Sequence, residues 1–185
     1  HTATMQIRHK NREIYFREQA ECTQKYVIPY IEQVLCIKPN LRVLEIGCGE
    51  GGNLKPFLDV GCHCVGIDID VAQVEKAKAF FANHSLNKNL RLIANDIYKV
   101  SPNEIGNFDL IILRDVIEHL PNQELFMHQL KCFMHSESVV FFGFPVWCNP
   151  FGGHQQICRS KWLSHTPWFH LLPKRLYKKV LQFGG

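Results

Sequence analysis

The chain of 185 residues is long enough for one domain with a substantial core, and its 46% hydrophobic and 21% charged residues are ordinary for a globular protein. A net charge of +4 gives no basis for nucleic-acid binding, and no run of about 18 apolar residues predicts a membrane span. Several of the eight cysteines fall in apolar segments typical of core strands, which favours a reducing cytoplasm over a disulfide framework.

Helices and strands alternate along the chain after an N-terminal helical segment, which apolar side chains at helical spacing predict for residues 11–37. Strands are then predicted at 41–46, 62–69, 90–96, 108–115 and 138–144, and helices at 53–60, 71–85 and 122–134. The predicted strands are continuous apolar runs, as in a parallel sheet that is buried on both faces. We therefore predict an α/β fold with a doubly wound, mostly parallel sheet.

A glycine-rich stretch, "VLEIGCGEGG" at residues 43–52, follows the first predicted strand. Glycine clusters mark places where the backbone bends tightly or approaches a ligand closely. The stretch therefore predicts either a tight strand–helix turn or a loop whose backbone contacts a bound molecule. Glu45 lies before the glycines and Glu50 among them, which favours a ligand with positive charge over a pyrophosphate.

Short acids stand at the ends of the next two predicted strands. Asp68 comes 19 residues after Gly49, where a carboxylate can bond both hydroxyls of a ribose. Asp96 ends the following strand and can accept a hydrogen bond from an adenine amine, with Ile97 packed against the ring. Each acid taken alone is as typical of a turn or a helix cap, which is the role expected of Asp70. Because parallel strands end at one edge of the sheet, together they indicate a nucleoside site there.

A cationic nucleoside without phosphate fits both observations. S-adenosylmethionine carries a ribose, an adenine, a sulfonium and an ammonium group, whereas a nicotinamide dinucleotide carries an anionic pyrophosphate. The sequence therefore favours S-adenosylmethionine as the cofactor, with Glu45 orienting the loop or the ammonium group.

Four motifs in this order, "VLEIGCGEGG", "VGIDID", "ANDI" and "FDLIILRDVIEHLPN", resemble the class I S-adenosylmethionine-dependent methyltransferases. The resemblance covers residues 41–145 and implies a Rossmann-like sheet whose last two strands form an antiparallel hairpin. Five strands are legible here, so we expect the hairpin to be missing from this chain or to lie within residues 145–185.

The resemblance also implies which residues bind the cofactor and how the single domain, residues 1–185, is divided. The implied contacts are Glu45, Gly47, Gly49 and the backbone of Arg114 at the methionine moiety, Asp68 at the ribose, and Asp96 and Ile97 at the adenine, with Cys48 and Ile69 as further cofactor-binding residues. The helical segment 11–37 then precedes a cofactor-binding core at 41–144 and a substrate-side lid or tail at 145–185.

Two histidines are candidate catalytic bases. Methyl transfer needs the nucleophile held in line with the methyl group, and a base only where the nucleophile starts protonated. His119 follows the fourth strand, and imidazole exchanges protons near neutral pH, although the Glu-His pair there is as typical of a loop-organising element. His154 lies in "FPVWCNPFGGHQQ", which predicts a lid over the site or a packed connection. Asp115 is placed like His119, and Tyr15 or Tyr26 is a candidate to close over the cofactor.

No metal site is predicted. Strand alternation sends Cys62 and Cys64 to one face and His63 to the other, and no C-x-x-C pair occurs. The basic segment "PKRLYKKVLQFGG" is either a solvated helix face or a weak contact to a membrane surface or an anionic substrate.

The sequence thus predicts methyl transfer from S-adenosylmethionine to a small-molecule acceptor. Two alternatives stay open: a methyltransferase for a lipid-linked or macromolecular acceptor, and a non-catalytic module that binds the cofactor. We expect no nucleic-acid partner, and the acceptor, the methylated atom and the oligomeric state are left open.

Overall fold

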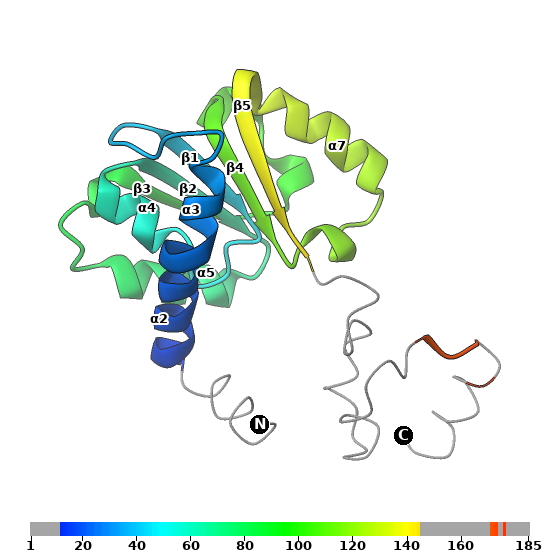
Figure 1. Cartoon of the computed structure of the whole chain (residues 1–185), viewed down its shortest axis with the longest axis horizontal. Coiled ribbons are helices and arrows are strands. Elements are labelled where there is room, and N and C mark those ends of the chain that lie inside the picture. Colours follow the sequence, from blue (N-terminus) through cyan, green and yellow to red (C-terminus); the bar gives the residue numbers. More distant parts are fainter. Residues whose placement is uncertain (1–11, 145–170, 174–175, 177–185) are drawn as a thin grey trace. The chain divides into compact units, whose positions relative to one another are not determined.

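The computed structural model describes residues 12–144, 171–173 and 176. The chain divides into two units, and every element below belongs to the unit that spans Thr4–Gly143. Five parallel strands form its sheet in the order β3-β2-β1-β4-β5 (Figure 1), with the bounds β1 Arg42–Ile46, β2 His63–Asp68, β3 Leu90–Ala94, β4 Phe108–Arg114 and β5 Met134–Gly143. The order switches direction between β1 and β4, so the predicted doubly wound α/β fold is confirmed.

Helices connect the strands and cover both faces of the sheet. Their bounds are α2 Arg12–Cys22, α3 Ile28–Ile31, α4 Lys55–Val60, α5 Val71–Phe81, α6 Pro102–Ile105 and α7 Gln123–Cys132. The N-terminal helix widens into one π-helical turn, Thr23–Val27, between α2 and α3. Such turns are rare inside helices and occur often at functional sites.

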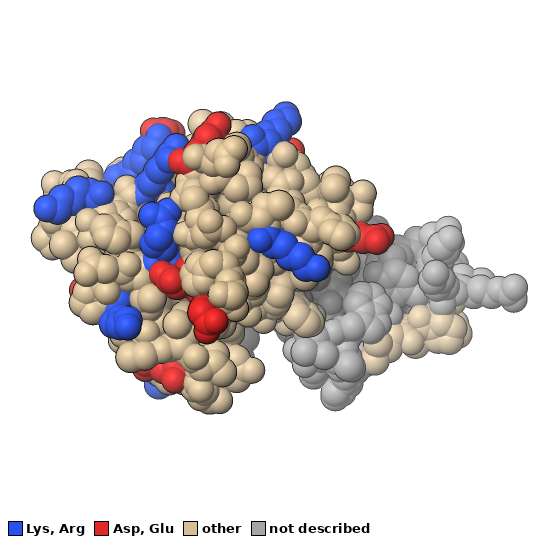
Figure 2. All heavy atoms as spheres, turned by 90° about the horizontal axis from the view of Figure 1, so that it is seen from above, with Lys and Arg blue, Asp and Glu red and all other residues tan. Residues whose placement is uncertain are grey.

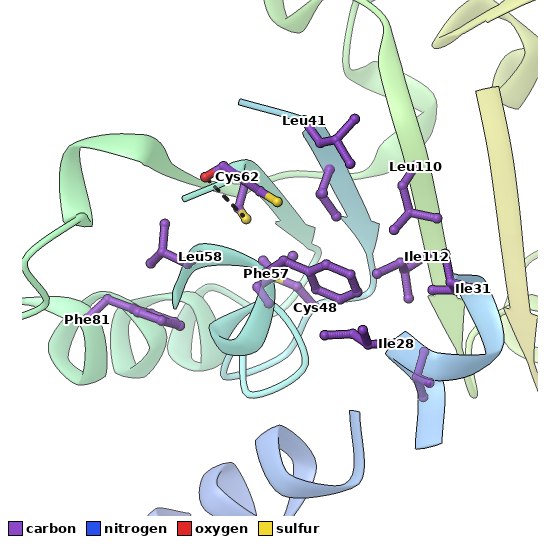
Figure 3. Packing of buried hydrophobic residues seen from close by; sticks show 14 residues of the cluster. Ile28, Ile31, Leu41, Cys48, Phe57, Leu58, Cys62, Phe81, Leu110 and Ile112 are labelled. Carbon is purple, nitrogen blue, oxygen red and sulfur yellow. Dashed lines mark hydrogen bonds between the residues drawn. The ribbon is translucent and has the colours of Figure 1, made fainter. Parts of the chain in front are cut away.

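Apolar side chains alternate between the two faces of the sheet and form two buried clusters. One cluster lies between the sheet and α3 and α4 (Figure 3), and its members include Ile28, Ile31, Val43, Phe57, Leu58, Cys64, Leu110 and Ile112. The other lies beneath α6 and α7 and includes Leu44, Ile46, Val65, Ile105, Ile111, Phe126, Leu130 and Phe133. Burial on both faces explains why the inner strands β1, β2 and β4 are largely apolar, whereas the edge strands β3 and β5 are only partly buried.

Several element boundaries differ from those expected from the sequence. The N-terminal helical segment ends at Ile31 rather than at residue 37. Met134 begins β5 instead of ending the preceding helix, because α7 ends at Cys132 and the buried Phe133 that follows it has left the helical conformation. Val71, the first residue of α5, lies outside the core and is 59% exposed.

The start of α5 depends on a capping carboxylate. Asp70 Oδ1 accepts hydrogen bonds from the backbone N–H groups of Ala72 (2.9 Å) and Gln73 (3.3 Å). The hydrogen bond from Gln73 is the first cause that holds the pKa of Asp70 below its ordinary value. We expect Asp70→Ala to lower the thermal midpoint by a few degrees at neutral pH, measured by circular dichroism.

The pH dependence of this effect has a defined sign. A lowered carboxyl pKa stabilises the fold above the ordinary pKa, and this stability is lost as the pH falls below about 4. The melting difference between wild type and Asp70→Ala should therefore shrink in acid. Asp70→Ser, which can still cap the helix, should melt close to wild type, and an alanine variant equal to wild type at neutral pH would contradict the capping role.

Charges of both signs are mixed on the surface. On the face shown in Figure 2, lysine and arginine side chains are interspersed with acidic ones over the described residues. In the described part of the chain, none of the helices has both the length and the apolar character needed to cross a bilayer.

Candidate active site

A cavity of about 640 Å³ opens at the carboxyl ends of the strands, beside the switch in strand order. Its walls come from α2, from the loops after β1, β2, β3 and β4, and from the end of β4 itself. Small-molecule sites in open α/β sheets lie at this position and have this size. Of the predicted cofactor-binding residues, those that line the cavity are Gly47, Cys48, Gly49, Asp68, Ile69, Asp96, Ile97 and Arg114.

The glycine loop is tied to the end of β2. The N–H groups of Gly47 and Cys48 donate to the carbonyl of Ile67 at 2.7 and 3.0 Å, and Gly49 N–H donates to Asp68 Oδ2 at 2.7 Å. Gly47 has φ +72°, and a Cβ there would lie 2.3 Å from Cγ2 of Val116. The loop therefore requires glycine for both its left-handed backbone and its contact with the wall after β4.

Asp68 organises two turns at once. Besides Gly49 N–H on Oδ2, its Oδ1 accepts the N–H of Asp70 at 2.8 Å. A carboxylate has about four lone-pair sites, so both oxygens retain acceptor capacity toward the cavity. The residue predicted to bind a ribose thus also fixes the loop after β1, a role that its spacing from the glycines did not reveal.

The loop after β3 presents an acid beside apolar side chains. Asp96 Oδ1 accepts the N–H of Tyr98 at 3.1 Å and so starts a short helical turn, Ile97–Lys99. Ile97 is 5% exposed and belongs to the core, whereas Ile69 is 73% exposed, and both line the cavity. At this end of the cavity, apolar side chains therefore lie beside a carboxylate.

Glu45 lies behind the cavity wall rather than in it. Its Oε1 accepts a hydrogen bond from Asn53 Nδ2 at 2.7 Å, while Oε2 is buried without a hydrogen-bond partner. Burial is the main cause that raises the pKa of Glu45 to about 8, against the lowering effects of Asn53 and Arg114. Near neutral pH the carboxyl is therefore mostly protonated, and its contact with the cavity passes through Asn53.

Glu50 is compensated by cations from two helices. The side chain is buried, and its Oε1 lies 3.4 Å from Arg12 Nε and 3.9 Å from Lys76 Nζ. Glu50 lines the cavity as the sequence suggested, but it also joins α2 to α5 across the glycine loop.

A buried polar network links the N-terminal helix to the sheet. Asn53 Oδ1 accepts from Thr23 Oγ1 at 2.9 Å and from Arg114 Nη1 at 2.8 Å. Thr23 and Asn53 were missed at the sequence level, because a single Thr in a helix and an Asn after a glycine loop carry no distinctive pattern. The π-helical turn that places Thr23 has no sequence signature either.

Some of the candidate catalytic residues line the cavity, and the others lie outside the described residues. His119 lines the cavity with its side chain 69% exposed, and its Nε2 lies 4.0 Å from Glu118 Oε1. Asp115 and Tyr15 also line the cavity, and burial together with the charge of Asp115 raises the pKa of the Tyr15 phenol. Tyr26 does not line it and is 62% exposed. His154 and its aromatic stretch lie outside the described residues, as does the basic segment from residue 173 except for Pro173 and Leu176.

Cys62, directly before β2, and Cys64, within it, pack on the same side as the sequence predicts. Cys62 and Cys64 are buried while His63 is exposed, and burial raises the pKa of the Cys62 thiol to about 11. Within residues 12–144, 171–173 and 176, no group of three or more His, Cys, Asp and Glu side chains is arranged to hold a metal ion.

The chain is similar to known proteins over most of its length. Residues 16–172 match a family model described as "Methyltransferase domain". The chain is 26% identical over 125 residues to ubiquinone biosynthesis O-methyltransferase of Bartonella tribocorum, which covers 62% of this chain and 49% of that protein. It is 29% identical over 96 residues to sterol 24-C-methyltransferase of Gibberella zeae, which covers 51% and 25%. This chain thus spans about half the length of the first relative and a quarter of the length of the second.

Solved structures share the fold. A proposed S-adenosyl-L-methionine-dependent methyltransferase from Methanococcus maripaludis superposes with a TM-score of 0.61 at 16% identity, covering 84% of this chain and 65% of that one. Magnesium protoporphyrin IX methyltransferase from Synechocystis, solved with bound S-adenosylmethionine, gives 0.52 at 21% identity, covering 63% and 55%. The five strands described here belong to that fold, while an antiparallel hairpin does not occur within residues 12–144.

Proposed function

This chain belongs to the methyltransferase domain family, with S-adenosylmethionine as its cofactor, and we propose that it transfers a methyl group to a small-molecule acceptor. The names of the two relatives given above refer to ubiquinone biosynthesis and to a sterol, which supports an acceptor of that size class. The observation that carries the proposal is the row of carboxylates and apolar side chains after β2 and β3. It lies beside a glycine loop that a hydrogen bond to Asp68 holds in place.

The residues present fit the cofactor. The cavity has the volume of a small-molecule site, and Gly49 has φ +51°, a left-handed backbone that residues with a side chain rarely adopt. The carboxylates on its walls suit a ligand that carries sulfonium and ammonium charges. A pyrophosphate would be repelled by the same groups.

We assign the adenosine end to the loops after β2 and β3. Asp68 keeps acceptor capacity for the ribose hydroxyls while it holds the glycine loop in place. Asp96 would accept the adenine amine, and Ile69 and Ile97 would pack against the ring. Gly47, Cys48 and Gly49 would then face the methionine moiety, with Glu45 supporting them through Asn53.

When bound, S-adenosylmethionine supplies an electrophilic methyl group that is already activated by its sulfonium. What this chain contributes is orientation of the acceptor, which accounts for most of the acceleration in such a reaction. We propose that His119 takes the proton from an O–H or N–H acceptor, with the Glu118 carboxylate beside it. His154 remains a second candidate from the sequence.

We place this chemistry in the cytoplasm. Six cysteines in the described part of the chain are unpaired, three of them buried among core side chains, which is the usual state in a reducing compartment. No nucleic-acid partner is proposed.

Calorimetry with S-adenosylhomocysteine, the demethylated product, tests the proposal. Asp68→Ala removes a charged acceptor and frees the glycine loop, so we expect binding to weaken at least about tenfold. The matched control is Asp59→Ala, since Asp59 pairs with Lys55 and His84 outside the cavity and its loss should leave binding unchanged.

Two outcomes would count against the proposal. Equal affinity in wild type and Asp68→Ala would remove the ribose assignment. Binding of a nicotinamide dinucleotide in place of S-adenosylhomocysteine would overturn the cofactor assignment as a whole.

A further inference from the structure

Arg114 ends β4 and lies in the cavity wall, half-buried. It is the one lysine or arginine among the described residues that line the cavity. Carboxyl side chains dominate the other ionisable groups there, namely Glu18, Glu50, Asp68, Asp96 and Asp115. A single fixed cation among five acids requires an explanation.

The neighbours that hold Arg114 are neutral. Its Nη1 donates to Asn53 Oδ1 at 2.8 Å and to Thr23 Oγ1 at 3.3 Å, and its Nη2 lies 3.8 Å from Cys22 Sγ. None of the ion pairs found among the described residues includes Arg114. The nearest carboxyl in this network, Glu45, is reached through Asn53.

A guanidinium has five N–H donors, and these contacts use three of them. Two donors, Nε–H and the second N–H of Nη2, can therefore still donate hydrogen bonds to a ligand. The Glu45 carboxyl is linked to this partly buried charge only through Asn53, so an anion in direct contact with the guanidinium would offset the cost of burying it. Because Asn53 and Thr23 fix the side chain, the donors are already oriented before any ligand arrives.

The strand order places Arg114 at one end of a line of binding groups. Asp96 follows β3, Asp68 ends β2, the glycine loop follows β1, and Arg114 ends β4, which is the order of those strands in the sheet. Adjacent strands lie about 4.8 Å apart, so β2 and β4 are separated by about 10 Å. If the ribose lies at Asp68, the amino-acid part of the cofactor extends toward Arg114.

We propose that the side chain of Arg114 binds the carboxylate of the methionine moiety of S-adenosylmethionine. This inference rests on the function proposed above and adds a specificity-determining residue to it. The resemblance to the family implied only the Arg114 backbone, whereas the contacts described here give the side chain a role of its own. The planar fork of arginine matches the two oxygens of a carboxylate.

The consequence is selectivity for a cofactor that retains its carboxylate. We expect wild type to bind S-adenosylhomocysteine roughly 10- to 100-fold more tightly than decarboxylated S-adenosylhomocysteine, the range of a charge-assisted hydrogen-bonded pair. Methylthioadenosine, which lacks the whole amino-acid part, reports on the adenosine end alone.

Calorimetry of the full chain with these three ligands tests the proposal. In Arg114→Met the preference for the carboxylate-bearing ligand should fall to within about threefold, while affinity for methylthioadenosine stays at the wild-type value. Arg114→Lys should keep an intermediate preference, since it retains the charge without the fork. Arg91→Met is the matched control, because Arg91 bonds the carbonyl of Glu104 and does not line this cavity.

If Arg114→Met still binds methylthioadenosine and keeps the wild-type preference for the carboxylate-bearing ligand, the proposal is overturned. The arginine would then bind an acceptor carboxylate or serve only the network with Thr23. Loss of methylthioadenosine binding in Arg114→Met would also overturn the proposal, because it would show that the arginine is needed only to keep the cavity formed. Failure of the proposed function looks different, since wild type itself would then bind none of the three adenosyl ligands.

Discussion

Replacement of Gly47 by alanine is expected to weaken S-adenosylhomocysteine binding strongly and to destabilise the fold. The new Cβ would lie 2.3 Å from Val116 Cγ2, and the backbone at φ +72° is strained for any residue with a side chain. Left-handed backbone and overpacking together cost about 2–5 kcal/mol. Because Gly47 N–H also ties the loop to Ile67, displacement of the loop should weaken binding roughly 100-fold. Urea denaturation and calorimetry measure the two effects.

Two further variants separate the clash from the backbone strain. Val116→Ala removes both methyl groups that the new Cβ meets, so Gly47→Ala combined with Val116→Ala should regain a large part of the lost stability. Gly61→Ala is the matched control: it also has positive φ, at +99°, but its Cβ would lie 3.4 Å from Pro39 Cβ in ordinary contact. It should lose stability without losing ligand binding. If Gly47→Ala behaves like Gly61→Ala, the contact with Val116 has no role.

The sheet was predictable because its signal is repeated in every strand. The inner strands β1, β2 and β4 are mostly buried, so each is a largely apolar run, whereas the edge strands β3 and β5 are only partly buried. The helix ends were less predictable, since the end of a helix depends on neighbours that are distant in sequence. Ile31 is the last buried residue of the N-terminal segment, and the apolar spacing continues to Val34, which is 73% exposed.

In the candidate site, residues that follow strands could be placed from sequence, but their contacts could not. The strand order brings Gly49 and Asp68 together, and the spacing alone suggested that both lie near one ligand. Contacts that cross between elements, such as Thr23 with Asn53 over 30 residues or Arg12 with Glu50, depend on how α2 packs against the sheet. No local pattern encodes that packing, and so Glu45 and Glu50 looked equivalent from the sequence.

Glu45 and Glu50 in fact differ, because Glu50 lies beside two cations whereas Glu45 has only the Asn53 amide in direct contact. We therefore expect a large pH dependence of stability from Glu45. Burial raises the pKa of Glu45 to about 8, well above the ordinary value of a Glu carboxyl near 4.3. A raised carboxyl pKa means that the folded state binds the proton more tightly, so this stability is complete in acid and is lost as the pH rises through 8. The full change is about 5 kcal/mol, most of it between pH 5 and about 8.

Glu45→Gln should abolish that dependence, because an amide of the same shape keeps the acceptor for Asn53 Nδ2 and carries no titratable proton. Urea midpoints measured from pH 5 to about 9 should fall steeply in wild type and remain nearly flat in Glu45→Gln, with the two curves diverging most above pH 8. Glu50→Gln is the contrasting variant, since it leaves Arg12 and Lys76 without their shared carboxylate and should lower stability at neutral pH. Parallel curves for wild type and Glu45→Gln would show that the buried carboxyl beneath the glycine loop is ionised throughout, and that Asn53 and Arg114 together stabilise its charge in the folded state.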